Sequence, residues 1–190
     1  MRAALILCFT LTGITTIASA DEAPGTSRSM AFTTAGSLRM TLRVGDVQVI
    51  GTQDEKVKVT WTPSNDDVEV RFDRTDEKQA SLRIDGPSKK VRYRIEVPAR
   101  TDLAVDMNAG NLEIRGVTGN LDAGLNAGNL EVRLPEPSTI RSARLSVLSG
   151  GLTARPWKVD KGGIARSFET EGSGEFDLHA RVMAGQLTIR

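Results

Sequence analysis

The chain has 190 residues, which is enough for one domain with a sizeable core or for two small domains. It contains 25 Lys and Arg against 24 Asp and Glu, and the two counts are equal once Arg2 is set aside with the first 20 residues. A chain without net charge lacks the basic surface of nucleic-acid-binding proteins, so we expect no nucleic-acid partner. The only cysteine, Cys8, lies in the same segment, which excludes disulfides, thiolate metal sites and a cysteine nucleophile from the rest.

The first 20 residues have the three parts of a secretory signal peptide. Arg2 supplies a positive charge, residues 3–11 form an apolar run, and residues 18–20 form a small-x-small cleavage site. We predict cleavage after residue 20 and a location in the periplasm, outside the cell or on its surface. The apolar run is too short for an uncleaved anchor, which needs about 20 apolar residues. No later stretch is longer, so we expect no transmembrane segment after cleavage.

Residues 21–31 are polar and rich in turn formers, and we expect them to form a flexible leader. Residues 32–107 then alternate apolar and polar side chains, which is the pattern of strands with one buried and one solvated face. Trp61 keeps the inward parity of its run and is expected in the core. The alternating runs are residues 38–44, 47–49, 57–61, 68–72, 82–84, 91–97 and 103–107. This region is predicted to consist of antiparallel strands.

From residue 108 a Gly-Asn-Leu triplet recurs every nine residues. Glycine accepts the positive φ of a tight corner, and asparagine hydrogen-bonds to a turned backbone or to its counterpart in the next coil. The leucine begins an inward-facing row, which a single strand cannot shelter, so the repeat predicts a stack of strands. The triplets are Gly110-Asn111-Leu112, Gly119-Asn120-Leu121 and Gly128-Asn129-Leu130.

Two geometries fit this nine-residue step. In a flat β-solenoid two steps make one turn, so Asn111 stacks on Asn129 and Asn120 lies on the opposite sheet. In an antiparallel meander the triplets mark successive hairpins. We favour the solenoid, because the same side of each strand begins with the same triplet. The expected fold is all-β, with N-terminal antiparallel strands (32–107) leading into a solenoid-like stack of glycine-turn strands (108–190), in one continuous domain.

Several segments carry a resemblance to a known family. They are Ser37-Leu38, residues 44–51 (Val-Gly-Asp-Val-Gln-Val-Ile-Gly), residues 56–60, the Ala-Gly-Asn-Leu-Glu repeats and residues 172–176. Together they resemble the bacterial putative-adhesin, β-strand-repeat family of unknown function, related to head-domain auto-transporter adhesins. The resemblance covers residues 32–190. It implies an exported or envelope-attached all-β protein that binds at a surface, and it supplies no catalytic residues.

The residues that enzymes and metal sites need are sparse. The only histidine, His179, has outward strand parity, and no serine elbow or phosphate-binding loop is present. We therefore expect no catalytic residues, no cofactor and no enzyme; an enzyme would require the fold to gather Glu169, Glu171 and His179 into one cleft. One histidine and no cysteine beyond residue 20 leave few of the ligands that zinc prefers. The repeat asparagines stand where calcium β-rolls have aspartates, so we expect no metal site.

Two surface features are candidates for contact with a partner. Lys90, Arg92 and Arg94 share a strand face, which either pairs with acidic neighbours or receives anionic glycan or lipid headgroups. Trp157 lies in a turn where it can stack on sugars. We expect a binding or scaffold module for an envelope polymer, glycan or protein. The alternative is a self-assembling structural protein whose end strands, including the one that reaches Arg190, form homo-oligomers.

Overall fold

The computed structural model describes residues 26–62, 67–86 and 91–190; the expected signal peptide, residues 21–25 and Lys90 lie outside these ranges. The described chain is all-β, with two short 3-10 helices, and none of its helices is long and apolar enough to cross a membrane. The strands are β1 (Thr26–Ala31), β2 (Ser37–Thr52), β3 (Lys56–Thr62), β4 (Glu69–Arg74), β5 (Gln79–Asp85), β6 (Arg92–Pro98), β7 (Asp102–Arg115), β8 (Leu121–Arg133), β9 (Ile140–Ala154), β10 (Val159–Glu171) and β11 (Phe176–Ile189).

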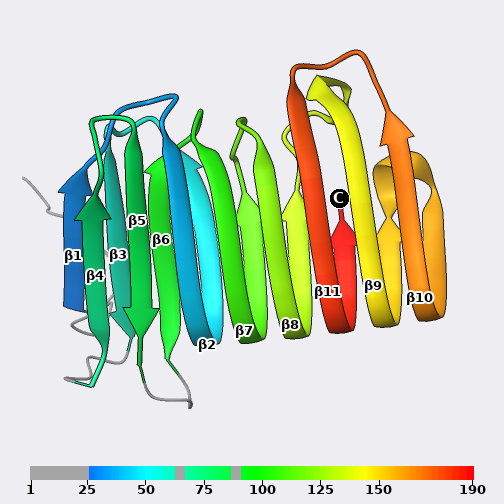
Figure 1. Cartoon of the computed structure of the whole chain (residues 1–190), viewed down its shortest axis with the longest axis horizontal. Coiled ribbons are helices and arrows are strands. Elements are labelled where there is room, and N and C mark those ends of the chain that lie inside the picture. Colours follow the sequence, from blue (N-terminus) through cyan, green and yellow to red (C-terminus); the bar gives the residue numbers. More distant parts are fainter. Residues whose placement is uncertain (1–25, 63–66, 87–90) are drawn as a thin grey trace, which may run out of the picture.

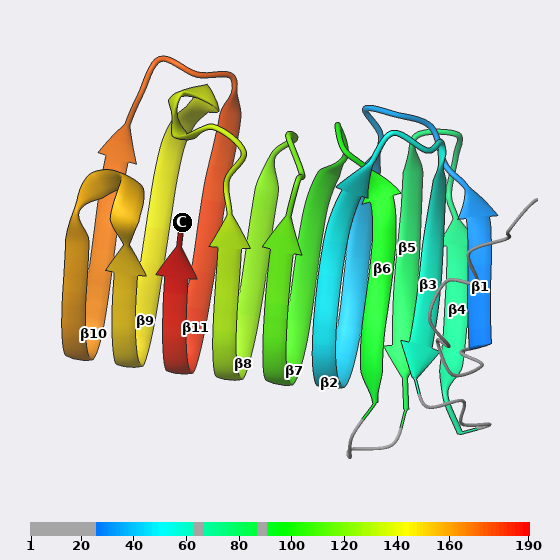
Figure 2. The same cartoon turned by 180° about the vertical axis from the view of Figure 1, so that it is seen from behind.

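These strands form one mixed sheet in the order β1-β3-β6-β2-β7-β8-β11-β9-β10, with β5 paired to β2 and β4 paired to β5 (Figure 1). The long strands β2 and β7 to β11 have 13 to 16 residues each. Each turns once at the lower edge, so that its two arms lie in two facing layers (Figures 1 and 2). The sheet does not close on itself. The strands therefore form one open sheet, and its long strands are bent.

The bends are built on glycines that stack on one another. Gly45, Gly110, Gly128, Gly185 and Gly150 all have φ between 121° and 153°, a region that side chains rarely adopt. A Cβ atom on any of the last four would lie 1.8 to 2.0 Å from the carbonyl oxygen of the glycine in the neighbouring strand. Only glycine permits this approach, so the bends fix which residues face each other along the stack.

The register confirms the expected relation between the triplets. β7 and β8 pair in parallel, with Asn111 opposite Asn129 and Leu112 opposite Leu130. Two nine-residue steps therefore make one bent strand, and Asn120 lies at the opposite edge, between β7 and β8. The parallel pairing contradicts the antiparallel meander. Gly45 of β2 pairs with Gly110 in the same way, so the stack begins one strand earlier than the triplets indicate.

The expected antiparallel arrangement of residues 32–107 is wrong in part. β1 with β3, β3 with β6 and β4 with β5 are antiparallel, but β2 runs parallel to β5, β6 and β7. The expected leader is also wrong where it is described, because residues 26–31 form β1. Its side chains are mostly exposed, so backbone pairing to β3, rather than burial, makes it a strand. Alternation predicts which face is buried but not the direction of the partner.

The two layers enclose one core that runs through the whole stack. Leu112, Leu121 and Leu130 are all buried in it, as is Trp61, as expected. Leu112 and Leu130 are neighbours in one layer, whereas Leu121 pairs with Leu103 in the other. Burying each large aliphatic side chain contributes about 1.5–3 kcal/mol before entropy is subtracted. Both layers are therefore needed to shield the inward-facing side chains from water.

The C-terminal strand lies inside the stack and is not an end strand. β11 pairs in parallel with β8 on one side and with β9 on the other. The expectation that the strand reaching Arg190 offers a free edge is therefore wrong. The end strands are β10 at one end and β1 and β4 at the other.

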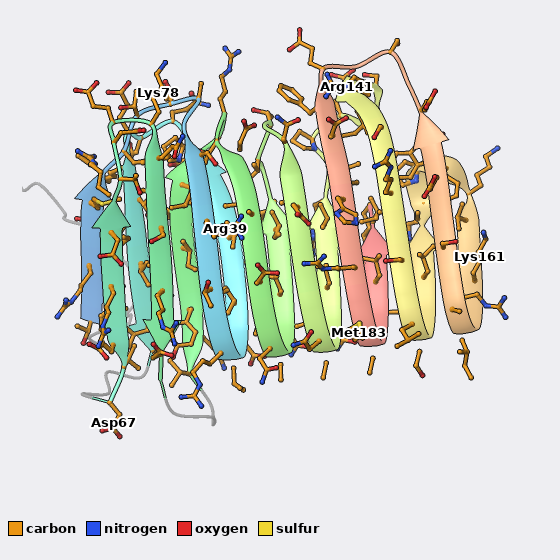
Figure 3. The ribbon with its side chains drawn as sticks, in the orientation of Figure 1. Arg39, Asp67, Lys78, Arg141, Lys161 and Met183 are labelled. Atoms are coloured by element: carbon orange, nitrogen blue, oxygen red, sulfur yellow. The ribbon has the colours of Figure 1, made fainter. Side chains whose placement is uncertain are left out.

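Cations cover the core at the β10 end. Lys161 and Arg166 pair in register with buried residues of β9, so both side chains have inward parity. Lys161 Nζ donates to the carbonyl oxygen of Ser167 at 2.9 Å, and Arg166 Nε donates to that of Gly162 at 2.8 Å. Figure 3 labels Lys161 at this end of the molecule. Inward-pointing charges on an edge strand disfavour the addition of another strand.

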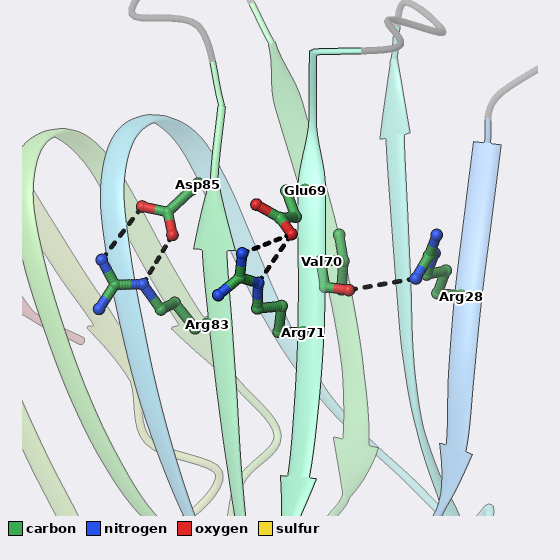
Figure 4. Close-up of polar contacts among 6 residues, drawn as sticks. All are labelled: Arg28, Glu69, Val70, Arg71, Arg83 and Asp85. Atoms are coloured by element: carbon green, nitrogen blue, oxygen red, sulfur yellow. Dashed lines mark hydrogen bonds and ion pairs between the residues drawn. The ribbon is translucent and has the colours of Figure 1, made fainter.

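The other end is covered in the same way. Arg28 of β1 has inward parity, and its Nη1 donates to the carbonyl oxygen of Val70 in β4 at 3.4 Å (Figure 4). Arg74 of β4 donates in return to the carbonyl oxygen of Ala31 in β1. Both ends are therefore closed by cations that reach between the arms of the stack, an arrangement that opposes end-to-end self-assembly.

We expect Gly128→Ala to lower the free energy of unfolding by about 2–4 kcal/mol. Gly128 has a φ of 130°, and its Cβ would lie 1.9 Å from the carbonyl oxygen of Gly110. Gly162→Ala is the matched control, because nothing lies within 4 Å of its Cβ position. Urea unfolding measures both. Equal losses in the two variants would show that the stacked bends do not fix the register.

We expect the double variant Lys161→Val, Arg166→Val to associate end to end, because an apolar edge strand is a template for pairing. Light scattering over a range of protein concentrations measures the mass. Lys78→Val with Arg100→Val removes the same charge from exposed positions away from β10 and should leave the mass unchanged. If both variants stay as the wild type, the cations do not protect the edge.

Candidate functional site

A groove of about 630 Å³ lies over β3, β6, β2, β7 and β8, on the arms that face the viewer in Figure 2. We call it the polar groove, because ten of its thirteen lining residues are polar and carry hydroxyl, amide, carboxylate or guanidinium groups. Its polar residues are Asp46, Gln48, Thr60, Thr62, Arg92, Arg94, Asn111, Glu113, Asn129 and Glu131. No single segment of the sequence supplies this set, since it comes from five strands.

The strand register arranges these side chains in two rows of five. Residues opposite each other on neighbouring strands point to the same face and lie about 5 Å apart. The row nearer the bends is Thr62, Arg92, Asp46, Asn111 and Asn129, and the second row is Thr60, Arg94, Gln48, Glu113 and Glu131. Both rows cross the strands. A ligand that follows the groove must therefore extend along the stack and not along a strand.

The row nearer the bends contains a hydrogen-bonded ladder. Asn129 Nδ2 donates to Asn111 Oδ1 at 2.9 Å, and Asn111 Nδ2 donates to Asp46 Oδ1 at 2.7 Å. Asp46 only accepts when ionised, so it fixes the direction of the two amides. Each amide has two donor hydrogens and two acceptor lone pairs. The ladder therefore leaves groups of both kinds for a ligand.

The carboxylates of the second row are already neutralised. Arg133 Nε lies 3.2 Å from a Glu113 oxygen and 2.8 Å from a Glu131 oxygen, and Arg190 lies 3.5 Å from Glu131. Gln48 Nε2 adds a hydrogen bond of 3.0 Å to Glu113. At the β7 and β8 end of the groove, the negative charge of the carboxylates is therefore balanced by arginines.

Two of the expected contact residues lie in the groove. Arg92 and Arg94 line its β6 end, next to Asp46 and Gln48 in register. Arg94 Nε is bound to Glu96 at 3.0 Å. Trp157 lies elsewhere: it packs against the core next to Phe168, with ring centroids 5.6 Å apart. Trp157 is only partly buried, so its use as a stacking surface stays a prediction.

The repeat residues divide between two edges of the molecule. Gly110 and Gly128 form bends, and Asn111 and Asn129 beside them line the groove. Gly119 lies at the opposite edge and allows the backbone to approach Thr101 closely. A Cβ atom on Gly119 would lie 2.3 Å from the carbonyl oxygen of Thr101.

Asn120, beside Gly119, is a link between strands and not a groove residue. Its Nδ2 donates to Asp102 Oδ1 at 2.9 Å, and its Oδ1 accepts from the Asp177 N–H at 2.9 Å.

Sequence reasoning missed most of the groove. Alternation gives Glu113 and Glu131 outward positions but indicates no shared site, and Gly45-Asp46 has the pattern of a turn. A signal existed, because Gly45-Asp46-Val47-Gln48-Val49 has the same pattern as Gly-Asn-Leu-Glu-Ile at residues 110–114. Aligning those two segments places Asp46 in the asparagine row.

A second hollow of about 530 Å³ contains part of the residue set that an enzyme would require. Glu171 and His179 both line it, together with Arg141, Arg144 and Asp177. Glu169 is not in the lining, although it pairs in register with Arg144. The structure therefore gathers two of the three residues that a catalytic cleft would require.

The histidine of this hollow is held by a carboxylate. His179 Nδ1 lies 3.2 Å from Asp122 Oδ1. In residues 26–62, 67–86 and 91–190, no group of three His, Cys, Asp or Glu is arranged to hold a metal ion.

The pKa of one carboxyl in this hollow, that of Asp177, lies below its ordinary value. Arg141 donates to Asp177 through Nε at 3.0 Å and through Nη2, and these hydrogen bonds lower the pKa of Asp177. The charge of Arg144 lowers the same pKa to a smaller extent.

We expect Arg141→Gln to raise the pKa of Asp177 toward its ordinary value, and Arg144→Gln to raise it less. A carboxyl whose pKa is lower in the folded state than in the unfolded state stabilises the fold at pH values above its unfolded-state pKa. This stability is lost as the pH falls through the folded-state pKa. The stability difference between wild type and Arg141→Gln should therefore exist at neutral pH and vanish in acid. NMR titration of the Asp177 carboxyl measures the shift. A larger shift in Arg144→Gln would contradict the assignment.

One solved structure supports the fold. No protein-family model matches the chain, and no curated protein matches its sequence. A crystal structure of a "putative cell adhesion protein" from Clostridium sporogenes matches 87% of this chain and 99% of its own, with a TM-score of 0.54 and 13% identity. At this identity the likeness shows the fold alone.

Two other solved structures are more distant. A "putative adhesin" from Bacteroides fragilis matches 88% of this chain and 97% of its own, with a TM-score of 0.27 and 11% identity. Another from Parabacteroides distasonis matches 88% and 71%, with a TM-score of 0.26 and 10% identity. Their TM-scores are too low to carry an argument. The resemblance inferred from the sequence thus holds at the level of an adhesin-like fold.

Proposed function

We propose that the chain is an exported, non-enzymatic binding module of the bacterial cell envelope, built as a short β-solenoid, and that its polar groove holds an acidic glycan. The observation that carries the proposal is the pair of five-residue rows that cross five strands. An extended polymer can contact several positions of such rows at once. The adhesion-protein description of the Clostridium structure with the same fold supports a surface role.

The chemistry of the groove favours a glycan. Sugar hydroxyls donate and accept hydrogen bonds, and the amides of Asn111 and Asn129 offer groups of both kinds. Arg92 and Arg94 at one end favour a carboxylate or sulfate on the sugar. Glu113 and Glu131 oppose an anion less than their charge suggests, because Arg133 bridges them. Arg92, which unlike Arg94 is in no ion pair among the described residues, therefore favours an acidic group on the ligand at this position of the groove.

Export is the second part of the proposal. It is supported by the charged, apolar and small-residue segments in order at residues 1–20. The self-assembling alternative is opposed by the cations at both ends of the stack. A monomer that presents its groove along the side of the stack fits a binding role better.

We expect Arg92→Gln with Arg94→Gln to weaken acidic-glycan binding by roughly ten- to a hundredfold, since hydrogen bonds to charged groups contribute about 1.5–3 kcal/mol. Calorimetry with acidic and neutral envelope oligosaccharides measures the affinity. Asn111→Ala should weaken both classes. Arg144→Gln, which removes a charge from another hollow, should bind as the wild type.

Three results would overturn the proposal. Binding that is absent for every oligosaccharide, or lost equally in Arg144→Gln, would exclude the groove as the site. Shortened oligosaccharides in mass spectra after incubation would show that the protein is an enzyme.

A further inference from the structure

We propose that the lower edge of β7 to β11 docks edge-on against the surface of an anionic lipid bilayer. This edge, called here the bend edge, consists of the four residues at the bend of each strand: residues 108–111, 126–129, 148–151, 162–165 and 183–186. The proposal does not depend on the polar groove, which lies on a face of the sheet and shares only Asn111 and Asn129 with this edge.

Exposed aliphatic side chains gather at one end of the bend edge. In the described residues the large exposed hydrophobics are Leu148, Ile164 and Met183, with exposed fractions of 50%, 74% and 49%. Met183 and Leu148 lie side by side, because the residues before and after them are paired between β11 and β9. Ile164 pairs with Ser149, next to Leu148. Figure 3 shows Met183 at the lower edge. Such clustering marks a contact surface and not scattered exposure.

The rest of the bend edge carries no charge. Its segments read Asn-Ala-Gly-Asn twice, Leu-Ser-Gly-Gly, Gly-Gly-Ile-Ala and Met-Ala-Gly-Gln, in a chain that is 26% charged. An uncharged edge can enter the headgroup region without desolvating an ion, which is the main cost of such a transfer. Asn126 Nδ2 donates to Asn108 Oδ1 at 3.1 Å, so part of its amide capacity is already satisfied.

Cations border the aliphatic patch. Lys161 and Arg166 flank Ile164 in β10 and donate to main-chain carbonyls, which leaves their charge available to anionic headgroups. Stable membrane attachment takes two weak signals, such as apolar insertion together with basic residues. The bend edge supplies both at one place.

A second copy of the chain is a poorer occupant. A standard interface buries roughly 800 Å² per partner, and three aliphatic side chains on an edge are a small part of that area. β10 is also closed to strand pairing by its inward cations. The bends of β7 to β11 are paired in register with neighbouring strands, so we expect the aliphatics to enter a bilayer without reordering of the backbone.

Flotation with vesicles tests the proposal. The secreted protein should bind vesicles of phosphatidylglycerol and phosphatidylethanolamine, and bind phosphatidylcholine vesicles at least tenfold less. Leu148→Ser with Ile164→Ser and Met183→Ser should lose binding by tenfold or more. Lys161→Gln with Arg166→Gln should lose it for anionic vesicles only. All variants share the same N-terminal segment, so their differences report on the bend edge.

A spectroscopic variant locates the contact. Met183→Trp should show a blue-shifted emission with anionic vesicles, whereas Ser173→Trp, in the connection between β10 and β11, should not. Arg92→Gln with Arg94→Gln should bind vesicles as the wild type, which separates this proposal from glycan binding.

Three outcomes would overturn the proposal. They are absence of vesicle binding, unchanged binding by the triple serine variant, or a dimer in light scattering that the triple serine variant abolishes. The last would assign the edge to a second copy.

Discussion

The contact on which the structure depends is the approach of one bend's carbonyl oxygen to the next bend's glycine. A Cβ atom would come within 1.8–2.0 Å of that oxygen at Gly110, Gly128, Gly150 and Gly185. With no side chain present, neighbouring bends lie flush and the strands cannot slip by one residue. A slip of one residue would turn every buried side chain outward. The glycines therefore determine the register of the whole stack, including positions far from the bends.

The same register produces the core and the groove. Inward positions align Leu112 with Leu130, and outward positions one residue away align Asn111 with Asn129. The first pair excludes water, and the second hydrogen-bonds along the stack. Changing the binding chemistry of an outward row therefore leaves the inward row intact. This separation lets a repeat fold keep its stability while its surface varies.

The repeat could be predicted from the sequence because it is local. The nine-residue step predicted that Asn111 faces Asn129 and that the three leucines share a core, and alternation predicted the burial of Trp61. The pairing partners and directions of strands that are distant in sequence could not be predicted. Nothing in residues 176–189 indicates that β11 separates β8 from β9, or that β2 runs parallel to β6. Alternation specifies a face, but direction and partner depend on segments far along the chain. For that reason Arg92 was predicted as a contact residue, but its place beside Asp46 in one row was not.

The position of β11 has a consequence for how the chain acquires its structure. β8 and β9 do not pair with each other, and β11 joins them. Until the last strand is available, β9 and β10 form a hairpin with no connection to the rest of the sheet. β11 thus joins the two parts of the sheet. The contacts it makes are among the most distant in sequence, which slows folding. The export that we propose would gain from this order, because a chain that crosses a membrane unfolded cannot complete this stack before β11 has followed the other strands.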